Sequence, residues 1–67
     1  MKIENLVPHQ EYKVFHGVER IARFNGIRWY GKKYTLDMEF SDTKQYNPFS
    51  IHQWEIEQNE IVISEIN

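Results

Sequence analysis

The sequence predicts an all-β protein, a small partly open antiparallel barrel or curled sheet of about five strands with an SH3-like or OB-like architecture. Residues 34–40 alternate strictly between apolar and polar side chains, which is typical of a half-buried strand. Asn25-Gly26 lies between apolar residues, and Asn-Gly is the strongest short signal for a β-hairpin turn. No segment shows the 3.6-residue apolar period of a long amphipathic helix.

The composition indicates one globular domain spanning residues 1–67. Of these residues 40% are hydrophobic and 15% are aromatic, and the formal net charge is only -2. A chain of this length buries about 60% of its unfolded surface, so a deep catalytic cleft is not expected. Cysteine is absent, which excludes disulfides and thiolate zinc sites and favours a reducing compartment. With no apolar run of about 20 residues and no signal peptide, we expect a cytoplasmic protein without membrane contact.

The first elements are a lead-in and a strand. Residues 1–9 form the lead-in segment, because Pro8 lacks a backbone donor and disfavours helix at Val7. A strand follows over residues 10–16, with Tyr12 and Val14 on its apolar face.

A central hairpin is predicted next, with a two-residue type I′ turn at Asn25-Gly26. Four pairs then lie opposite one another: Phe24 and Ile27, Ala22 and Trp29, Ile21 and Tyr30, Arg23 and Arg28. The first two pairs share the apolar face. A bulge or loop at residues 31–33 shifts the phase before the strand at 34–40. The alternative is one longer loop over residues 26–33 between strands at 18–25 and 34–40.

The C-terminal third predicts a second hairpin. Residues 41–48 are turn-rich, and residues 49–51 re-enter the core through a single 3₁₀ turn. A turn at Gln58-Asn59 places Ile56 opposite Ile61 and Trp54 opposite Ile63 in the core. The solvent face of this hairpin carries three acidic residues: Glu55, Glu57 and Glu60.

Charge is distributed unevenly along the chain. Between Arg20 and Leu36 there are five basic residues and no acidic one, whereas seven acidic residues and one basic residue follow from Asp37 onward. Cationic groups neutralise phosphates, and aromatic faces stack on bases. We therefore expect a non-enzymatic binding module that uses hairpin 20–34 to bind an anionic partner, either nucleic acid or an acidic protein surface. The candidate binding residues are Arg20, Arg23, Arg28, Trp29, Tyr30, Lys32 and Lys33.

Two alternatives stay open. A structural interpretation places Trp29 in the core and lets the basic residues balance the acidic half of the same molecule. A second functional hypothesis is a protein–protein interaction or inhibitor domain that acts through a sheet edge or through the acidic C-terminal hairpin. The oligomeric state is not predicted.

The sequence offers no catalytic or metal-binding motif, so we expect neither an enzyme nor a bound cofactor. His9, His16 and His52 lack a recognised ligand spacing. Ser50 with His52 forms no known nucleophile motif, and Asp37 and Glu39 lie on the solvent face of the alternating strand.

Overall fold

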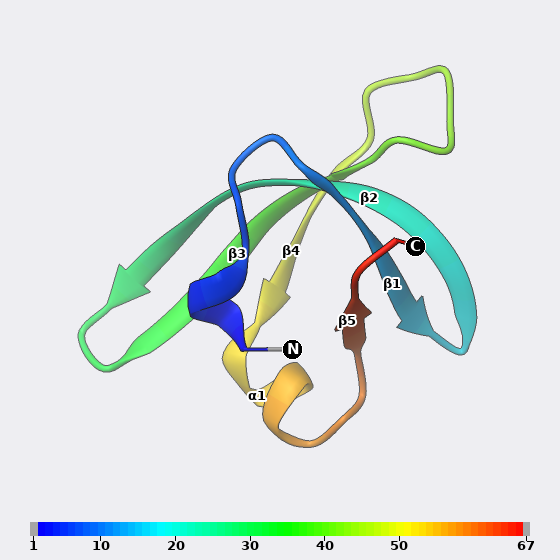
Figure 1. Cartoon of the computed structure of the whole chain (residues 1–67). Helices are drawn as coiled ribbons and strands as arrows, with labels where there is room; N and C mark the ends of the chain where they lie inside the picture. The colour runs from blue at the N-terminus through cyan, green and yellow to red at the C-terminus, as the bar shows by residue number, and fades with distance from the viewer. Residues whose placement is uncertain (1, 67) are drawn as a thin grey trace.

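The computed structural model describes residues 2–66, which form one five-stranded antiparallel sheet (Figure 1). The elements in chain order are the 3₁₀ turn η1 (Ile3–Asn5), β1 (Glu11–His16), β2 (Val18–Tyr30), β3 (Lys33–Phe40), β4 (Pro48–His52), the helix α1 (Gln53–Glu57) and β5 (Val62–Ser64). The spatial order is β4-β3-β2-β1-β5. The predicted all-β curled sheet is confirmed, and the described strands do not close into a barrel because β4 and β5 are its two edges.

Strand β2 organises the sheet, since it pairs with β1 along one half and with β3 along the other. Its 13 residues make it the longest strand. It pairs with β1 from His16 opposite Val18 to Glu11 opposite Arg23. In Figure 1 it arches across the molecule as a single curved ribbon. The curl of the whole sheet therefore follows the curvature of β2.

Asn25-Gly26 is not a turn but a bulge inside β2. Phe24 lies opposite Met38 and Gly26 lies opposite Asp37, so Asn25 is the extra residue. The φ angle of Gly26 is +157°, which residues with a side chain rarely adopt. Glycine thus serves here to bend a strand rather than to reverse the chain.

The chain reverses instead at Gly31-Lys32, a two-residue turn flanked by Tyr30 and Lys33. Gly31 has a φ of +65°, which suits a tight turn. The predicted pairs across Asn25-Gly26 are all wrong, because the partner of this segment is β3: Ala22 lies opposite Phe40, Phe24 opposite Met38, Ile27 opposite Leu36, Arg28 opposite Thr35 and Trp29 opposite Tyr34. The alternative interpretation had the correct partner strands, but residues 26–30 continue β2 rather than forming a loop.

The core lies on one face of the sheet, which we call the core face; the opposite side is the outer face. In β3 burial alternates as predicted, with Leu36 and Met38 inaccessible to solvent. In β1 the predicted strand is also confirmed, with Tyr12 and Val14 buried. The buried hydrophobic residues are Leu6, Tyr12, Val14, Ala22, Phe24, Tyr34, Leu36, Met38, Ile51, Ile61 and Ile63.

The predicted lead-in segment covers part of this core. It contains η1, and Leu6 just after η1 is buried. The backbone N–H of Val7 donates to the hydroxyl oxygen of Tyr12 at 2.8 Å. This hydrogen bond ties the segment to β1.

The predicted second hairpin does not form, because residues 53–57 are the helix α1. A capping box starts the helix: the N–H of His52 donates to Glu55 Oε1 at 3.0 Å, and the His52 side chain accepts from the Glu55 N–H. Asn59, with a φ of +57°, follows the helix in the left-handed conformation common after helix ends.

Strand β5 consequently pairs with β1, where Ile63 lies opposite Val14. The predicted pairs of Ile56 with Ile61 and of Trp54 with Ile63 are therefore wrong, and Trp54 is largely exposed. The predicted 3₁₀ turn at residues 49–51 is part of β4 instead, although Ile51 does enter the core.

The bulge requires glycine at position 26, and a substitution there tests this requirement. Gly26→Asn should lower the free energy of unfolding by about 1–3 kcal/mol, because φ near +157° is open almost only to glycine. Gly31→Asn is the matched control, since asparagine tolerates the left-handed turn conformation at φ +65°. Urea unfolding of both variants measures the difference. Equal and small losses at the two positions would instead support a turn at Asn25-Gly26.

Candidate ligand-binding site at the end of the β2–β3 hairpin

The structure separates the seven predicted site residues into two groups. The three arginines lie along β2, with Arg20 near its start, whereas the other four residues surround the turn between β2 and β3. The second group consists of Trp29, Tyr30, Lys32 and Lys33, which we call the hairpin-end residues. Only this group lies around a single turn, and within it Trp29 and Tyr30 point to opposite faces of the hairpin.

Each arginine is paired with a carboxylate on β3 or in the loop after it. Arg20 contacts Asp42 at 2.9 Å, Arg23 contacts Glu39 at 3.7 Å and Arg28 contacts Asp37 at 2.9 Å. The predicted repulsion between Arg23 and Arg28 does not arise, because these two residues are not opposite each other. The interpretation in which basic residues balance the acidic half is thus correct for the three arginines.

The Arg20 pair is the most elaborate of the three. Arg20 Nε and Nη2 both donate to the Asp42 carboxylate, at 3.1 and 2.9 Å, and the guanidinium carbon lies 3.6 Å from the centre of the Phe40 ring. Phe40 in turn stacks on Phe49 with ring centres 4.2 Å apart. The hydrogen bonds from Arg20 lower the pKa of Asp42 and raise that of Arg20. Arg20 therefore fastens the loop after β3 to β2.

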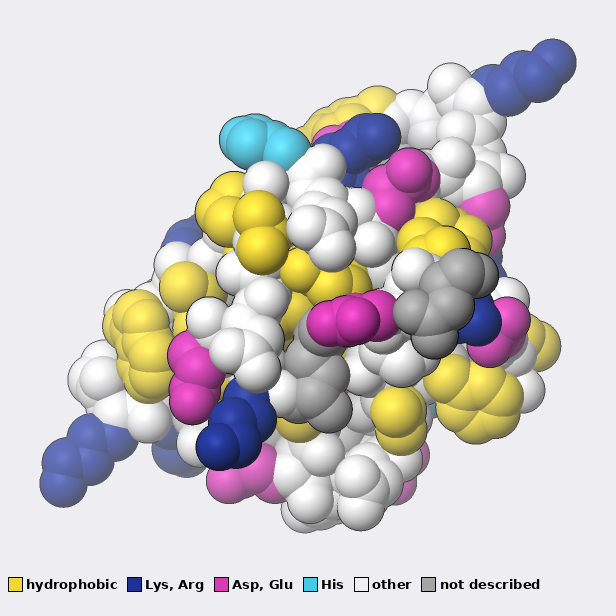
Figure 2. All heavy atoms as spheres, viewed as in Figure 1, with side chains coloured by type: hydrophobic (Ala, Val, Ile, Leu, Met, Phe, Trp, Pro, Cys, Tyr) yellow, Lys and Arg dark blue, Asp and Glu magenta, His cyan; other side chains and the backbone are white. Residues whose placement is uncertain are grey.

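The hairpin-end residues are exposed and unpaired. Trp29 and Tyr30 are each 58% exposed, so the interpretation of Trp29 as a core residue is wrong. Trp29 lies edge-on to Tyr34, with ring centres 5.3 Å apart. Within residues 2–66, neither Lys32 nor Lys33 has a carboxylate at ion-pair distance. In Figure 2 a basic side chain projects from the molecule beyond the hairpin end shown in Figure 1.

A pocket of about 500 Å³ lies between this hairpin end and α1. It arises because β4 stops at His52, opposite Thr35, while β3 continues to Lys33 without a neighbour on that side. The Gln53 side chain partly replaces the missing strand, since its Oε1 accepts the Tyr34 N–H at 3.2 Å. The lining residues are Tyr30, Lys33, Tyr34, Thr35, His52, Gln53, Trp54 and Glu57.

The pocket combines aromatic walls with a few polar groups. Trp54 from α1 is 53% exposed, and Tyr30 faces the same space. Burial, together with the nearby Glu57 carboxylate, raises the pKa of Tyr34. Thr35 Oγ1 and Ser41 Oγ are buried side-chain oxygens without a hydrogen-bond partner among the described residues. Thr35 is one of the residues that line this pocket, although its hydroxyl oxygen is closed to solvent.

Sequence reasoning missed the contribution of α1 to the site. Trp54 was predicted to be a core strand residue, and Thr35 only a polar position in a strand. Glu55 stands three residues after the N-cap, as in a capping box, but the N-cap is His52 rather than the usual Ser or Thr, so the sequence signal for the start of α1 is weak.

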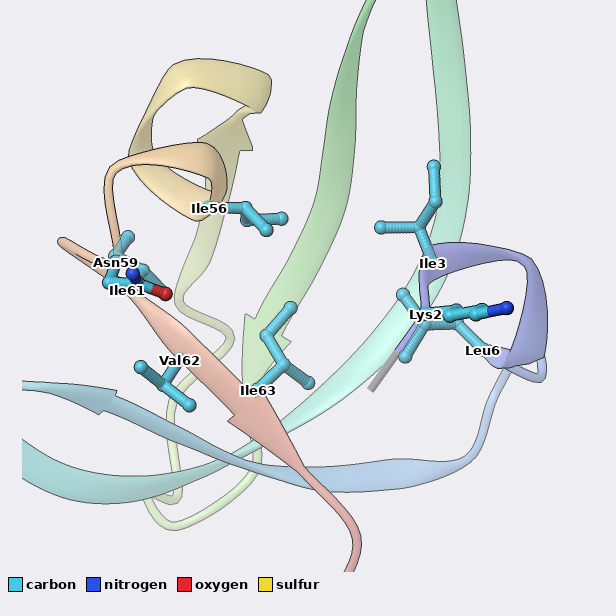
Figure 3. A pocket seen from close by; sticks show the side chains of 8 residues that line it. All are labelled: Lys2, Ile3, Leu6, Ile56, Asn59, Ile61, Val62 and Ile63. Carbon is cyan, nitrogen blue, oxygen red and sulfur yellow. The ribbon is translucent and has the colours of Figure 1, made fainter.

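A second cavity, of about 100 Å³, has no such chemistry. Ile56, Ile61 and Ile63 face Ile3 and Leu6 across it (Figure 3). Its wall is mostly aliphatic, so it is a gap between η1 and the C-terminal segment rather than a reactive site.

Residues 2–66 contain no group of three or more histidine, cysteine, aspartate or glutamate side chains able to hold a metal ion. His9, His16 and His52 lie in separate elements. None of the described helices has the length and hydropathy to span a membrane.

The Arg20–Asp42 pair predicts a pH-dependent contribution to stability. A carboxylate whose pKa is lower in the folded state stabilises the fold above its ordinary pKa, and this stabilisation is lost as the pH falls through the folded value. Asp42→Asn should therefore lower the melting temperature at pH 7, and its difference from wild type should shrink below about pH 4. Glu65→Gln is the control, because Glu65 has no basic partner at ion-pair distance within residues 2–66. A gap that stays constant with pH would contradict this role of Asp42.

Comparison of the chain with protein-family models, with curated proteins and with solved structures found no match.

Proposed function

We propose that this protein is a non-enzymatic binding module that holds nucleic acid at its hairpin end. One observation supports this proposal above all: Lys32 and Lys33 have no carboxylate partner within residues 2–66 and adjoin two exposed aromatic rings. An unpaired ammonium group on a projecting turn contacts a phosphate without first breaking an internal ion pair. The adjoining rings offer faces for stacking on bases.

Two interactions contribute to the binding free energy: lysine–phosphate contacts and base stacking. Each phosphate neutralised by a lysine releases condensed counterions, which makes binding depend on salt. Stacking of a base on an aromatic side chain contributes about 1–3 kcal/mol. The arginines contribute less in this proposal, because a phosphate must compete with Asp37, Glu39 or Asp42 for their guanidinium groups.

Nucleic acid is favoured over an acidic protein surface for the same site. Both partners supply anions, but in nucleic acid every phosphate is followed by a flat base. Such bases can stack on Trp29 and Tyr30. Docking through a sheet edge is less favoured, since β5 has only three residues and β4 begins with Pro48, which cannot donate a backbone hydrogen bond. An acidic face of the predicted C-terminal hairpin is not available, because residues 53–57 are helical.

We also propose an SH3-like architecture and a cytoplasmic location for this protein. The strand order, in which β1 to β4 are successive neighbours and β5 returns beside β1, supports the SH3-like rather than the OB-like alternative. The absence of cysteine supports a cytoplasmic location.

The two lysines supply the test. Lys32→Ala combined with Lys33→Ala should weaken binding of a labelled oligonucleotide of about 15 nucleotides, and should reduce the slope of log affinity against log salt by about 0.7 per lost contact with a single strand. Fluorescence anisotropy at several salt concentrations measures both quantities.

Lys13→Ala combined with Lys44→Ala removes the same charge away from the hairpin end and should leave the slope nearly unchanged. If the wild-type protein binds neither single- nor double-stranded oligonucleotides in a salt-dependent way, the nucleic-acid proposal fails. An acidic protein would then be the partner to test next, with the same variants of Lys32 and Lys33.

A further inference from the structure

We infer that the pocket between the hairpin end and α1 receives one unpaired nucleobase, so that the ligand is single-stranded nucleic acid. This inference rests on the proposed function and specifies its ligand. The pocket shares Tyr30 and Lys33 with the hairpin end. A strand whose phosphates lie along the lysines therefore passes the mouth of the pocket.

The size and walls of the pocket suit a flat aromatic ring. Its volume of about 500 Å³ lies within the range of about 300–1,000 Å³ in which proteins hold small molecules. Tyr30 approaches from the outer face of the sheet and Trp54 from α1, while Tyr34 forms part of the lining from β3. Trp54 is 53% exposed, so part of its ring is available to a ligand. Aromatic faces bind bases regardless of their identity.

Thr35 lines the pocket and carries a hydroxyl that the protein itself does not use. Thr35 Oγ1 is buried and has no hydrogen-bond partner in the described residues. Thr35 Oγ1 is also closed to solvent, so a base reaches it only after the side chains around it move, and the hydrogen bond then formed with the unpaired hydroxyl favours that movement. The edge of every nucleobase carries carbonyl, amine or ring-nitrogen groups that can exchange a hydrogen bond with a hydroxyl.

The charges around the pocket orient the strand. Lys33 lines one part of the pocket and Glu57 of α1 lines another. A phosphate is attracted to Lys33 and repelled by Glu57, so the backbone follows the turn at Gly31-Lys32 while the base points toward α1. A base in a duplex is stacked on its neighbours and presents only an edge in a groove. Stacking of a base on Tyr30 or Trp54 therefore requires a base outside a duplex.

The test compares three labelled probes in the same binding assay: a single strand of about 15 nucleotides, its duplex, and the same single strand with abasic positions. The inference predicts that the wild-type protein binds the single strand about 10-fold or more tightly than the other two. Trp54→Ala should weaken binding of the intact strand about 10-fold and change binding of the abasic strand little. Tyr46→Ala, which truncates an exposed ring in the loop after β3, is the matched control and should change neither.

Thr35→Val separates a ligand contact from a purely structural role. Valine keeps the shape of threonine and removes the unpaired hydroxyl, so the variant should melt at an equal or higher temperature than wild type while binding the single strand more weakly. If Trp54→Ala fails to fold, Trp54→Phe and Thr35→Val carry the test. Thr35→Val that lowers the melting temperature and leaves affinity unchanged would contradict the inference.

The outcomes separate the two proposals. If all three probes bind equally and only the change of Lys32 and Lys33 weakens binding, the pocket takes no base and the proposed function stands alone. If no probe binds, the proposed function fails and the inference fails with it. If polyglutamate competes as well as the single strand does, the site recognises charge alone and the inference about a base is wrong.

Discussion

The bulge at Asn25 in β2 is the constraint on which the rest of the structure depends. Successive residues of a strand point to opposite faces, so one extra residue exchanges the two faces for everything that follows it. Ahead of the bulge, Ala22 and Phe24 point to the core face; after it, Ile27 and Trp29 do so. If the same residues alternated regularly, with no bulge, Arg28 would point into the core. Gly26 makes the bulge possible, because its φ is one that other residues rarely adopt.

The same constraint shapes the candidate site. By shifting the register against β3, the bulge places Arg28 beside Asp37, and Arg23 is held by Glu39. It also turns Trp29 toward the core face and Tyr30 toward the outer face. Pairing with β1 stops at Arg23 and pairing with β4 stops at Thr35, so the far end of the hairpin has no neighbouring strand. Exposed rings, unpaired lysines and a pocket beside α1 are the consequence.

Much of the sheet could be predicted from the sequence, because two of its strands alternate between apolar and polar side chains. The strand around Leu36 alternates strictly and the strand around Tyr12 only loosely, since Phe15 breaks its pattern, and both strands are confirmed. The turn could not be located this way, since Asn25-Gly26 and Gly31-Lys32 are both acceptable local turn sequences. The second wins because it allows all of β2 and β3 to pair, which buries more apolar surface.

The candidate site was predictable only in part, and for physical reasons. The basic run and its aromatic residues were identified, but their pairing depends on carboxylates distant in the chain: Asp42 lies 22 residues after Arg20. The helix α1 has five residues, too few to show a helical period. Tryptophan is usually well buried, so nothing in the pattern distinguished the exposed Trp29 and Trp54 from core residues.

Cross-strand nuclear Overhauser effects in solution test the central claim most directly, since they report which residues of β2 and β3 lie opposite each other. A continuous, bulged β2 predicts contacts between Ile27 and Leu36 and between Trp29 and Tyr34. A reversal of the chain at Asn25-Gly26 would instead bring Trp29 against Ala22, and contacts between those two residues would contradict the account.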